Sequence, residues 1–304
     1  MALLALGLAG LGIVPVPGWI PELLSSLLPL IGILGLTLVA LALWRPSRFG
    51  LITAGLVVLL VLGRLSAGLW TRHLAPARPG DQRLSLLLIN AYALNEDPES
   101  LLRIMDDQQA DVTIITEPPP GLMKPLRALE EAPGSSHVLL RCPPTRGEHS
   151  WIVVRSRFPA ELVTDPHDGV LDCLVLGPQG PIRLIACHLL SPRTPGRYAQ
   201  AREQVARVIE QAHTEPAPLV IAGDFNAAPT SHLSSHLARQ TGTRRSKPFT
   251  AGGTYPAGLP RPFRVAIDDA LIGSDCSVVS WRTIGLPGSD HLGVRIDLAW
   301  RASP

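Results

Sequence analysis

The stretch PLVIAGDFNAAPTS, Pro218–Ser231, breaks off from an apolar run into Gly-Asp-Phe-Asn. Its Leu-Val-Ile segment is typical of a buried strand, yet Asp224 and Asn226 follow it at once. A turn would explain these two polar residues, because Gly, Asp and Asn favour turns. A functional site at the end of a strand would explain them equally well, so the other strands of the chain have to decide.

Other apolar runs also end in residues that bind metals or move protons. They are Asn90 in LLLINAY, Glu117 in IITEP, His188 in IACHLLSP, Asp268 in VAIDDAL, and Asp290 with His291 in GSDHLGV. Each alone has an ordinary explanation, such as a hydrogen-bonded strand end, a solvated carboxylate, a core histidine or a turn cap. Together at one sheet edge they would form a phosphoesterase centre, whose carboxylate oxygens suit Mg²⁺ or Mn²⁺ better than zinc.

From Leu84 onward, strand-like runs alternate with a few helical stretches. Asp97 is predicted to cap a helix over PESLLRIMDDQQA, and Arg197–His213 is predicted to form a later helix. The three prolines after Glu117 are expected to prevent an immediate continuation of regular structure. Many strands with few helices indicate a two-sheet α/β sandwich with helices outside, rather than a doubly wound sheet. The predicted strands are LSLLLIN, DVTIIT, SWIVVRS, GVLDCLVLG, IRLIACHL, PLVIAGD, AIDDALIG, CSVVSWRTIG and LGVRIDLAW.

Residues 1–74 are so apolar that they predict an all-α membrane anchor of about three helices. The charged residues there are Glu22, Arg45, Arg48, Arg64 and Arg72. The apolar segments are Ala2–Val16, Leu23–Trp44 and Phe49–Trp70, and the last two have the roughly 20 residues needed to cross a bilayer. A buried helical core is the alternative, although such continuous apolarity is not amphipathic.

The loop WRPSRFG carries Arg45 and Arg48 and no acid, so the positive-inside rule places it in the cytoplasm. Three spans would then put the chain after Trp70 on the extracytoplasmic side, although Arg72 and Arg78 pull the other way. A composition rich in Ala, Gly, Leu, Pro and Arg suggests a bacterial source, and hence the inner or plasma membrane.

The polar stretch APARPGDQR, residues 75–83, is predicted to link the anchor to a catalytic domain over residues 84–304. The formal net charge is +2 and the part after residue 74 is close to neutral, which is unlike a domain that binds duplex DNA. The cysteines lack the spacing of a zinc site, and the sequence leaves open whether they pair in an oxidising compartment. They are Cys142, Cys173, Cys187 and Cys276.

At these positions the chain resembles the endonuclease/exonuclease/phosphatase superfamily, which has the deoxyribonuclease-like fold. The resemblance covers about Leu84 to Trp300. INAYALN, ADVTIITE and IACHLLSP match the family's strands that end in Asn, Glu and His. GDFN is matched verbatim, GTYPAGLP and AIDDALIG match two later segments, and the terminal SDH is intact. Apolar segments ahead of such a domain resemble a bacterial membrane-anchored branch.

The resemblance implies a metal site and the ion that it would hold. Glu117 would be the main metal carboxylate, and Asn90 and Asp290 would help to hold Mg²⁺ or Mn²⁺. In phosphoryl transfer such a metal neutralises developing charge while a carboxylate activates the attacking water.

The resemblance also implies catalytic roles. Asp224 would orient or deprotonate the water, and Asn226 would position the phosphate or that water. His188, supported by Asp268, would stabilise phosphoryl charge, and His291 would act on the nucleophile or the phosphoryl oxygens. The sequence leaves open which Asp–His pair acts as base and which as acid.

Two positions depart from the family pattern. Asp269 stands where a His usually follows the Ile-Asp pair, so an additional acid is expected near the site. SDHLGV lacks the basic residue that commonly follows SDH. Neither departure removes a matched catalytic residue.

We expect a membrane-anchored, metal-dependent phosphoesterase that hydrolyses phosphodiester or phosphomonoester bonds by attack of activated water. Its expected partners are the lipid bilayer and a phosphoester, whether a lipid headgroup, a small molecule or a nucleic acid; no obligate protein partner is expected. A membrane-tethered nuclease is one alternative, although only Thr243–Lys247 forms a compact basic cluster. A non-catalytic membrane module that binds phosphoesters is the other.

Overall fold

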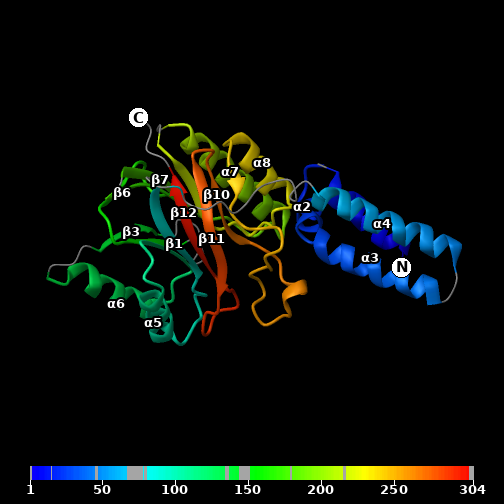
Figure 1. Cartoon of the computed structure of the whole chain (residues 1–304), viewed down its shortest axis with the longest axis horizontal. Helices are drawn as coiled ribbons and strands as arrows, with labels where there is room; N and C mark the ends of the chain where they lie inside the picture. The colour runs from blue at the N-terminus through cyan, green and yellow to red at the C-terminus, as the bar shows by residue number, and fades with distance from the viewer. Residues whose placement is uncertain are drawn as a thin grey trace.

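The computed structural model describes residues 2–14, 16–44, 47–66, 78, 81–133, 137–143, 151–178, 180–214 and 217–300. Two six-stranded sheets pack face to face, and helices cover their outer faces (Figure 1). Within the described residues four helices precede this sandwich, and α3 and α4 extend away from it (Figure 1). The predicted two-sheet α/β sandwich is therefore confirmed.

Each sheet is built around one central parallel pair of strands, β1 with β2 and β7 with β8. The other described pairings are antiparallel. The first sheet runs in the order β11 (Cys276–Ile284), β12 (Gly293–Trp300), β1 (Gln82–Asn90), β2 (Val112–Thr116), β4 (Ile152–Ser156) and β3 (Val138–Cys142). The second runs in the order β5 (Ala160–Leu162), β6 (Val170–Gly177), β7 (Gly180–His188), β8 (Leu219–Asp224), β10 (Asp268–Ile272) and β9 (Arg244–Arg245).

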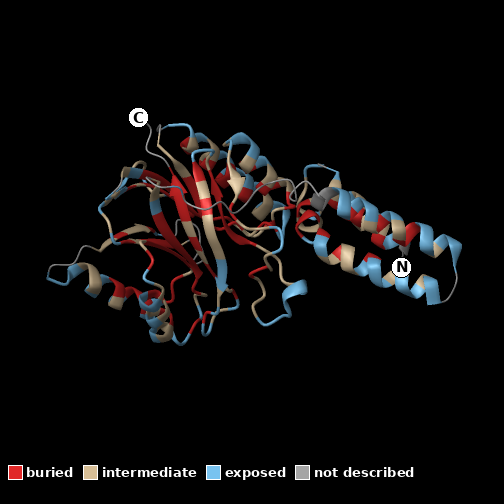
Figure 2. Ribbon diagram, viewed as in Figure 1, coloured by how far each residue is buried: buried red, intermediate tan, exposed pale blue. Residues whose placement is uncertain are grey.

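Helices cross over between the parallel strands and close the outer faces. α5 (Pro98–Gln108) connects β1 to β2, and α7 (Pro195–Ala212) connects β7 to β8. α5 packs with α6 (Pro120–Glu131) on the first sheet, and α7 packs with α8 (His232–Gln240) on the second. The main core lies between the sheets, where Figure 2 shows buried residues concentrated in the strands.

All the predicted strands are present, and so are both predicted helices. Asp97 caps α5 as predicted, since its carboxylate accepts a hydrogen bond from the Ser100 N–H at 3.1 Å. The prolines after Glu117 prevent an immediate continuation of regular structure, as predicted, because β2 ends at Thr116 and α6 begins only at Pro120. A proline in the first turn of a helix loses no hydrogen bond, since the N–H groups there have no partner within the helix.

The N-terminal apolar segments form more helices than predicted. α1 (Ala2–Ile13) is followed by α2 (Trp19–Ser26), α3 (Leu28–Trp44) and α4 (Arg48–Ser66). α2 and α3 divide the second predicted span with a bend of 65°. Pro29 accounts for the break, because its nitrogen cannot donate the next hydrogen bond of α2.

The three predicted spans are not confirmed. Within the described residues no single helix is long and apolar enough to cross a bilayer, whereas α2 and α3 together satisfy length and composition. The end of the third predicted span, residues 67–70, lies outside the described residues. So do Arg45 and most of the predicted linker, residues 75–77, 79 and 80.

The cysteines, whose pairing the sequence left open, are free and buried. Cys142, Cys173 and Cys276 pack between the sheets, and Cys187 packs beneath α7 and α8. Burial raises the pKa of Cys173 to about 12, so this thiol stays protonated and behaves as a small apolar group.

Hydrogen bonds join α2 to the sandwich. The Ser26 hydroxyl accepts from the Ala228 N–H at 3.3 Å. The Glu22 carboxylate accepts from the Leu233 N–H at 3.1 Å, in the first turn of α8. The N-terminal helices therefore contact the segment that directly follows the Gly-Asp-Phe-Asn motif.

Candidate active site

Four strands carry a row of apolar side chains that point into the core between the sheets. At one edge of the sandwich, each of these rows ends in a polar residue. Side chains alternate between the two faces of a strand, so a residue two positions beyond an inner core residue points the same way. Leu88 leads to Asn90 in β1, Ala186 to His188 in β7, Ala222 to Asp224 in β8, and Ala270 to Asp268 in β10. The four polar side chains therefore meet where the apolar core between the sheets ends.

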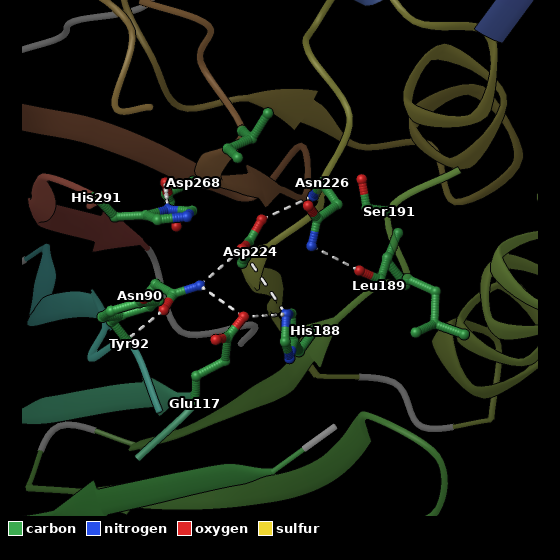
Figure 3. A network of polar contacts seen from close by, with 12 residues as sticks. Asn90, Tyr92, Glu117, His188, Leu189, Ser191, Asp224, Asn226, Asp268 and His291 are labelled. Carbon is green, nitrogen blue, oxygen red and sulfur yellow. Dashed lines mark hydrogen bonds and ion pairs between the residues drawn. The ribbon is translucent and has the colours of Figure 1, made fainter. Parts of the chain in front are cut away.

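Asp224 lies at the centre of this cluster (Figure 3). Its carboxylate accepts hydrogen bonds from Asn90 Nδ2 at 3.0 Å and from the Asn226 N–H at 2.7 Å. Nδ2 of Asn90 lies 3.4 Å from Oε1 of Glu117. Nε2 of His188 lies 3.4 Å from Glu117 Oε1 and 3.8 Å from Asp224 Oδ2.

Asp268 and His291 form a pair that lies beside this first group (Figure 3). Nδ1 of His291 lies 2.9 Å from Oδ2 of Asp268, and the Tyr255 ring packs against the imidazole with centroids 4.8 Å apart. Asp268 pairs directly with Asp224 in the sheet register. Asp290 lies at the rim instead, with a side chain 45% exposed and its Oδ1 4.0 Å from Nε2 of His291.

The structure thus brings together all the predicted site residues except Asp290, which is adjacent and more exposed. Three of them, Asp224, Asp268 and His291, offer metal-ligand atoms within 4.8 Å of one another. This trio differs from the predicted metal set of Glu117, Asn90 and Asp290. Asp224 contacts Asn90 of the predicted metal set and is itself a member of the trio, so the two sets of possible ligands lie next to each other.

Unusual backbone conformations aim two of these residues. Glu117 and Asn226 have φ of 50° and 47°, in the left-handed region that side chains seldom adopt. The turn at Asn226 lets its Nδ2 donate to the Leu189 carbonyl at 2.9 Å, beside the end of β7. Gly223 has φ of 141°, and a Cβ there would collide with the Cys187 carbonyl oxygen. Such strain is commonly found at functional sites.

Electrostatics separate the acids from the bases. Burial, and then the charge of Asp268, raise the pKa of Asp224 to about 6, although His291 and His188 oppose the change. Burial disfavours protonation of His291, but the carboxylates of Asp268, Asp224 and Asp290 outweigh it and raise the pKa of His291 to about 10. For His188 burial is likewise outweighed, by Glu117 and Asp224, and its pKa is raised.

The donor set fits a divalent cation. Asp224 and Asp268 face each other in register, and Glu117 supplies a further carboxylate within the same contact network. Buried carboxylates at such close range require a compensating positive charge, only part of which the two histidines can supply. Carboxylate and carboxamide oxygens are the ligands that Mg²⁺ and Mn²⁺ prefer.

Supporting residues in the matched motifs escaped the sequence reasoning. The buried Thr254 hydroxyl accepts from the Asp268 N–H at 3.3 Å, and so holds the start of β10. The Ser289 hydroxyl donates to the Asn90 carbonyl at 2.8 Å and accepts from the His291 N–H at 3.0 Å. Thr254 lies in GTYP and Ser289 lies in SDH, so the sequence motifs did mark both residues. Their individual hydrogen bonds depend on the tertiary fold and could not be predicted from the motifs.

Gln204 gave no signal in the sequence. It lies on α7, is fully buried, and its Nε2 donates to the Asp168 carbonyl at 2.7 Å and to the His188 carbonyl at 3.3 Å. Its Oε1 accepts from the Leu190 N–H at 2.8 Å. These bonds fix the chain on both sides of Leu189, directly after the strand that carries His188.

Asp269 lies next to the site, as expected, but its carboxylate does not join the cluster. Strand alternation points its side chain to the opposite face from Asp268. There the carboxylate accepts from the Ser246 hydroxyl at 2.6 Å and from Trp281 Nε1 at 3.3 Å, and lies 3.4 Å from Arg245 Nη1. Asp269 therefore neutralises charge outside the cluster.

Comparison with known proteins assigns the fold to a family. The sequence profile of the endonuclease/exonuclease/phosphatase family matches residues 87–291. The chain belongs to this family. Endonuclease/exonuclease/phosphatase proteins hydrolyse phosphoester bonds and generally depend on a divalent metal. None of the curated proteins compared matches the chain.

Solved structures of endonuclease/exonuclease/phosphatase proteins share the fold. One from Beutenbergia cavernae has 20% identity and a TM-score of 0.55, over 73% of each chain. One from Bacteroides vulgatus has 16% identity and a TM-score of 0.57, over 72% of this chain and 100% of that one. The 3' phosphatase NExo from Neisseria, bound to a product DNA hairpin, has 16% identity and a TM-score of 0.55, over 70% and 98%. At these identities the likeness concerns the fold.

Proposed function

We propose that this protein is a divalent-metal-dependent phosphoesterase that hydrolyses phosphodiester or phosphomonoester bonds by attack of activated water. The observation that carries the proposal is the buried contact network that joins Asn90, Glu117, His188 and Asp224. The carboxylate oxygens of this network can bind a metal ion and a water molecule, and its histidine can bind an anionic substrate.

Glu117 and Asn90, with Asp290 at the rim, would hold Mg²⁺ or Mn²⁺, which supplies positive charge against the phosphoryl oxygens when bound. Nδ2 of Asn90 contacts both Glu117 and Asp224 and so aligns the two carboxylates, while its Oδ1, the atom that would bind the metal, accepts from the Tyr92 N–H at 3.0 Å. The trio of Asp224, Asp268 and His291 is the alternative metal position.

Asp224 is the acceptor for the proton of the attacking water, because two hydrogen bonds fix its carboxylate at the centre of the network. Asn226, whose N–H and side chain are both anchored, positions the phosphate or that water. As the water oxygen bonds to phosphorus, the phosphorus–oxygen bond to the leaving group breaks.

His188 and His291 face this centre, and the raised pKa of each favours its cationic form. His188, held by Glu117, would stabilise the charge on the phosphoryl oxygens. His291, held by Asp268 and Tyr255, would interact with the phosphoryl oxygens and donate a proton to the leaving oxygen. Asp268 acts through His291 and is a positioning residue.

We further propose that residues 1–74 anchor the protein in a bacterial inner or plasma membrane, with residues 75–83 as linker and residues 84–304 as catalytic domain. Large apolar side chains exposed on α3 and α4 support this, since soluble surfaces seldom carry contiguous apolar patches (Figure 2). They include Leu36, Leu41, Leu43, Ile52, Leu59 and Leu62. A C-terminal reporter fusion tests the extracytoplasmic orientation, which a cytoplasmic signal would overturn.

The catalytic proposal is tested with full-length protein in non-ionic detergent and a panel of phosphoesters. The panel holds bis(p-nitrophenyl) phosphate, p-nitrophenyl phosphate, phospholipids, DNA and RNA, each with Mg²⁺, Mn²⁺ or EDTA. We expect turnover of at least one phosphoester with metal and none in EDTA. Cleavage of DNA or RNA alone would assign a nuclease, in line with the DNA hairpin bound to NExo. Binding without turnover of any member would favour the non-catalytic module.

A further inference from the structure

A cavity of about 720 Å³ lies where the N-terminal helices meet the sandwich. The bend between α2 and α3 lines one side of it with Ser26, Pro29 and Leu30. The opposite sides come from the loop at 228–230, from β9, and from loops within residues 247–266. None of the predicted catalytic or metal residues lines this cavity, so it is distinct from the candidate active site.

The lining of this junction cavity is strongly cationic. Among the described residues that line it, none is acidic. Its cationic residues are Arg239, Arg244, Arg245, Lys247, Arg261 and Arg264. Of these, Arg245 is paired with Asp269, which lies outside the lining.

Three of these arginines are held by carbonyl oxygens, and no ion pair to any of the three is formed within the described part of the chain. Arg244 donates to the Cys276 carbonyl at 2.8 Å. Arg261 donates to the Thr250 carbonyl at 2.5 Å, and Arg264 to the Leu259 carbonyl at 2.6 Å. A guanidinium carries five N–H donors, so each keeps further donors for a ligand. The guanidinium groups are thus fixed in place while still able to bind an anion.

Lys247 lies among these cationic residues. Its Nζ lies 3.3 Å from the Pro248 carbonyl oxygen. Burial first, and then Arg245 and Arg261, lower the pKa of Lys247 to about 8, although Asp269 opposes the change. This half-buried ammonium lies beside Arg245 and Arg261, where a bound anion would favour its charged form.

Apolar side chains form the rest of the wall and lead toward α3. Pro29 and Leu30 lie at the start of α3, and Phe249 and Val265 face the cavity from the sandwich. Outside the cavity, Leu27 and Leu34 on the same pair of helices are exposed. A ligand with a charged head and an apolar tail would therefore find a complementary surface for each part.

We propose that the junction cavity binds the phosphate group of an anionic amphiphile, with the apolar part of the ligand along α3. Arginine clusters suit phosphate because the planar guanidinium donates two parallel hydrogen bonds to its oxygens. Basic pockets beside apolar helices are an established arrangement for anionic lipid headgroups. This binding does not depend on hydrolysis at the candidate active site.

The chain has two lysines, Lys247 in the cavity and Lys124 on α6, which makes a matched labelling experiment available. Lys124 is exposed and belongs to the helix that covers the other sheet (Figure 1). Full-length protein in non-ionic micelles is acetylated at pH 8, and the modification of each lysine is followed by mass spectrometry. The additions are phosphatidylglycerol, diacylglycerol, inorganic phosphate and a single-stranded oligonucleotide, each at the same concentration.

We expect phosphatidylglycerol to slow the modification of Lys247 by about tenfold, which corresponds to about ten lipid-bound proteins for each lipid-free one. The modification rate of Lys124 should not change. Diacylglycerol, which lacks the phosphate, should give no protection, and inorganic phosphate should give less than the lipid. Equal protection by inorganic phosphate would overturn the amphiphile, because the apolar wall would then contribute nothing. Absence of protection by phosphatidylglycerol, equal protection of both lysines, or protection by the oligonucleotide alone would overturn the proposal.

A pair of arginine variants separates specific binding from the charge of the micelle. Arg264→Gln removes one cavity cation, and Arg127→Gln removes an exposed cation of α6. We expect Arg264→Gln to lose most of the lipid protection of Lys247 and Arg127→Gln to keep it. Equal effects of the two variants would contradict a site in the cavity. The readout is labelling, so inactivity toward phosphoesters would leave it intact.

Discussion

Nδ1 of His291 lies 2.9 Å from Oδ2 of Asp268, and both side chains are buried at the junction of the two sheets. The pair bridges them, since Asp268 begins β10 of one sheet and His291 lies two residues before β12 of the other. The carboxylate fixes the imidazole orientation and favours its protonated form. Removing this charge tests whether it is needed.

Asp268→Asn is expected to lower the pKa of His291 by about 1 or more, because an opposite charge at this range shifts a pKa by about 1–3. The pKa of His291 is raised to about 10 in the folded protein, so protonation of His291 stabilises the fold. This stabilisation is fully present at pH values below the pKa of His291 in the unfolded chain. That stabilisation is lost as pH rises through about 10, and at lower pH in the variant. Histidine NMR titration measures this change.

The same variant is expected to reduce kcat by about 10²-fold or more, as for other groups that take part in proton transfer. Asp275→Asn is the control, because Asp275 is exposed just before β11. An unchanged His291 titration in Asp268→Asn would show that the pair is not electrostatically coupled. Unchanged kcat would remove it from catalysis.

Metal binding is expected to stabilise the protein independently of any substrate. At about 100 times its Kd, Mg²⁺ or Mn²⁺ adds about 2.7 kcal/mol to the free energy of unfolding by mass action. Glu117→Gln should lose most of this increment, because it removes a charged ligand from the donor set. Glu99→Gln, in the first turn of α5, is the matched control. Thermal unfolding with and without EDTA gives the answer, and equal increments in both variants would exclude Glu117 as a ligand.

Much of the site was predictable because strand periodicity places it. Asn90, His188 and Asp224 each lie two residues beyond an inner core residue, so the apolar rows already aim them at one edge. The aim of Glu117 was not predictable from alternation alone, because it depends on a left-handed backbone turn after β2. The same alternation, applied to Asp269, would have placed its side chain outside the cluster.

The rest of the fold escaped prediction because it depends on contacts between distant residues. Glu22 and Leu233 are 211 positions apart, and no local pattern joins α2 to α8. The break before Pro29 had a local cause, yet continuous apolarity concealed it. The junction cavity arises only from this docking, so the sequence shows no more of it than the compact basic cluster at Thr243–Lys247.

The close approach of β7 and β8 makes glycine necessary at position 223. Gly223→Ala is expected to destabilise the protein by about 2 kcal/mol or more, because φ of 141° is strained for alanine and its Cβ would collide with the Cys187 carbonyl oxygen. Gly196→Ala in α7 is the control, since nothing lies within 4 Å of a Cβ there. That control should be neutral or slightly stabilising. Urea unfolding compares them, and equal stability would show that β7 and β8 can separate without cost.

The Glu22 carboxylate is expected to hold the N-terminal helices against α8. Glu22→Ala removes the acceptor of the Leu233 N–H and a negative charge from the N-terminus of α8, which costs about 1–3 kcal/mol for a buried donor left unpaired. Faster hydrogen exchange at the Leu233 amide, by about tenfold or more, measures this loss of local stability.

Glu99→Ala is the matched control, because Glu99 also lies in the first turn of a helix but on α5. It should leave exchange in α8 unchanged. If Glu22→Ala also leaves the Leu233 amide protected, then Ser231, which caps α8 by accepting from the Ser234 N–H at 3.0 Å, is sufficient to hold the helix end. In that case docking of α2 would depend instead on the hydrogen bonds from the Ala228 N–H to Ser26 and from the Thr230 hydroxyl to the Ser25 carbonyl, and on apolar packing.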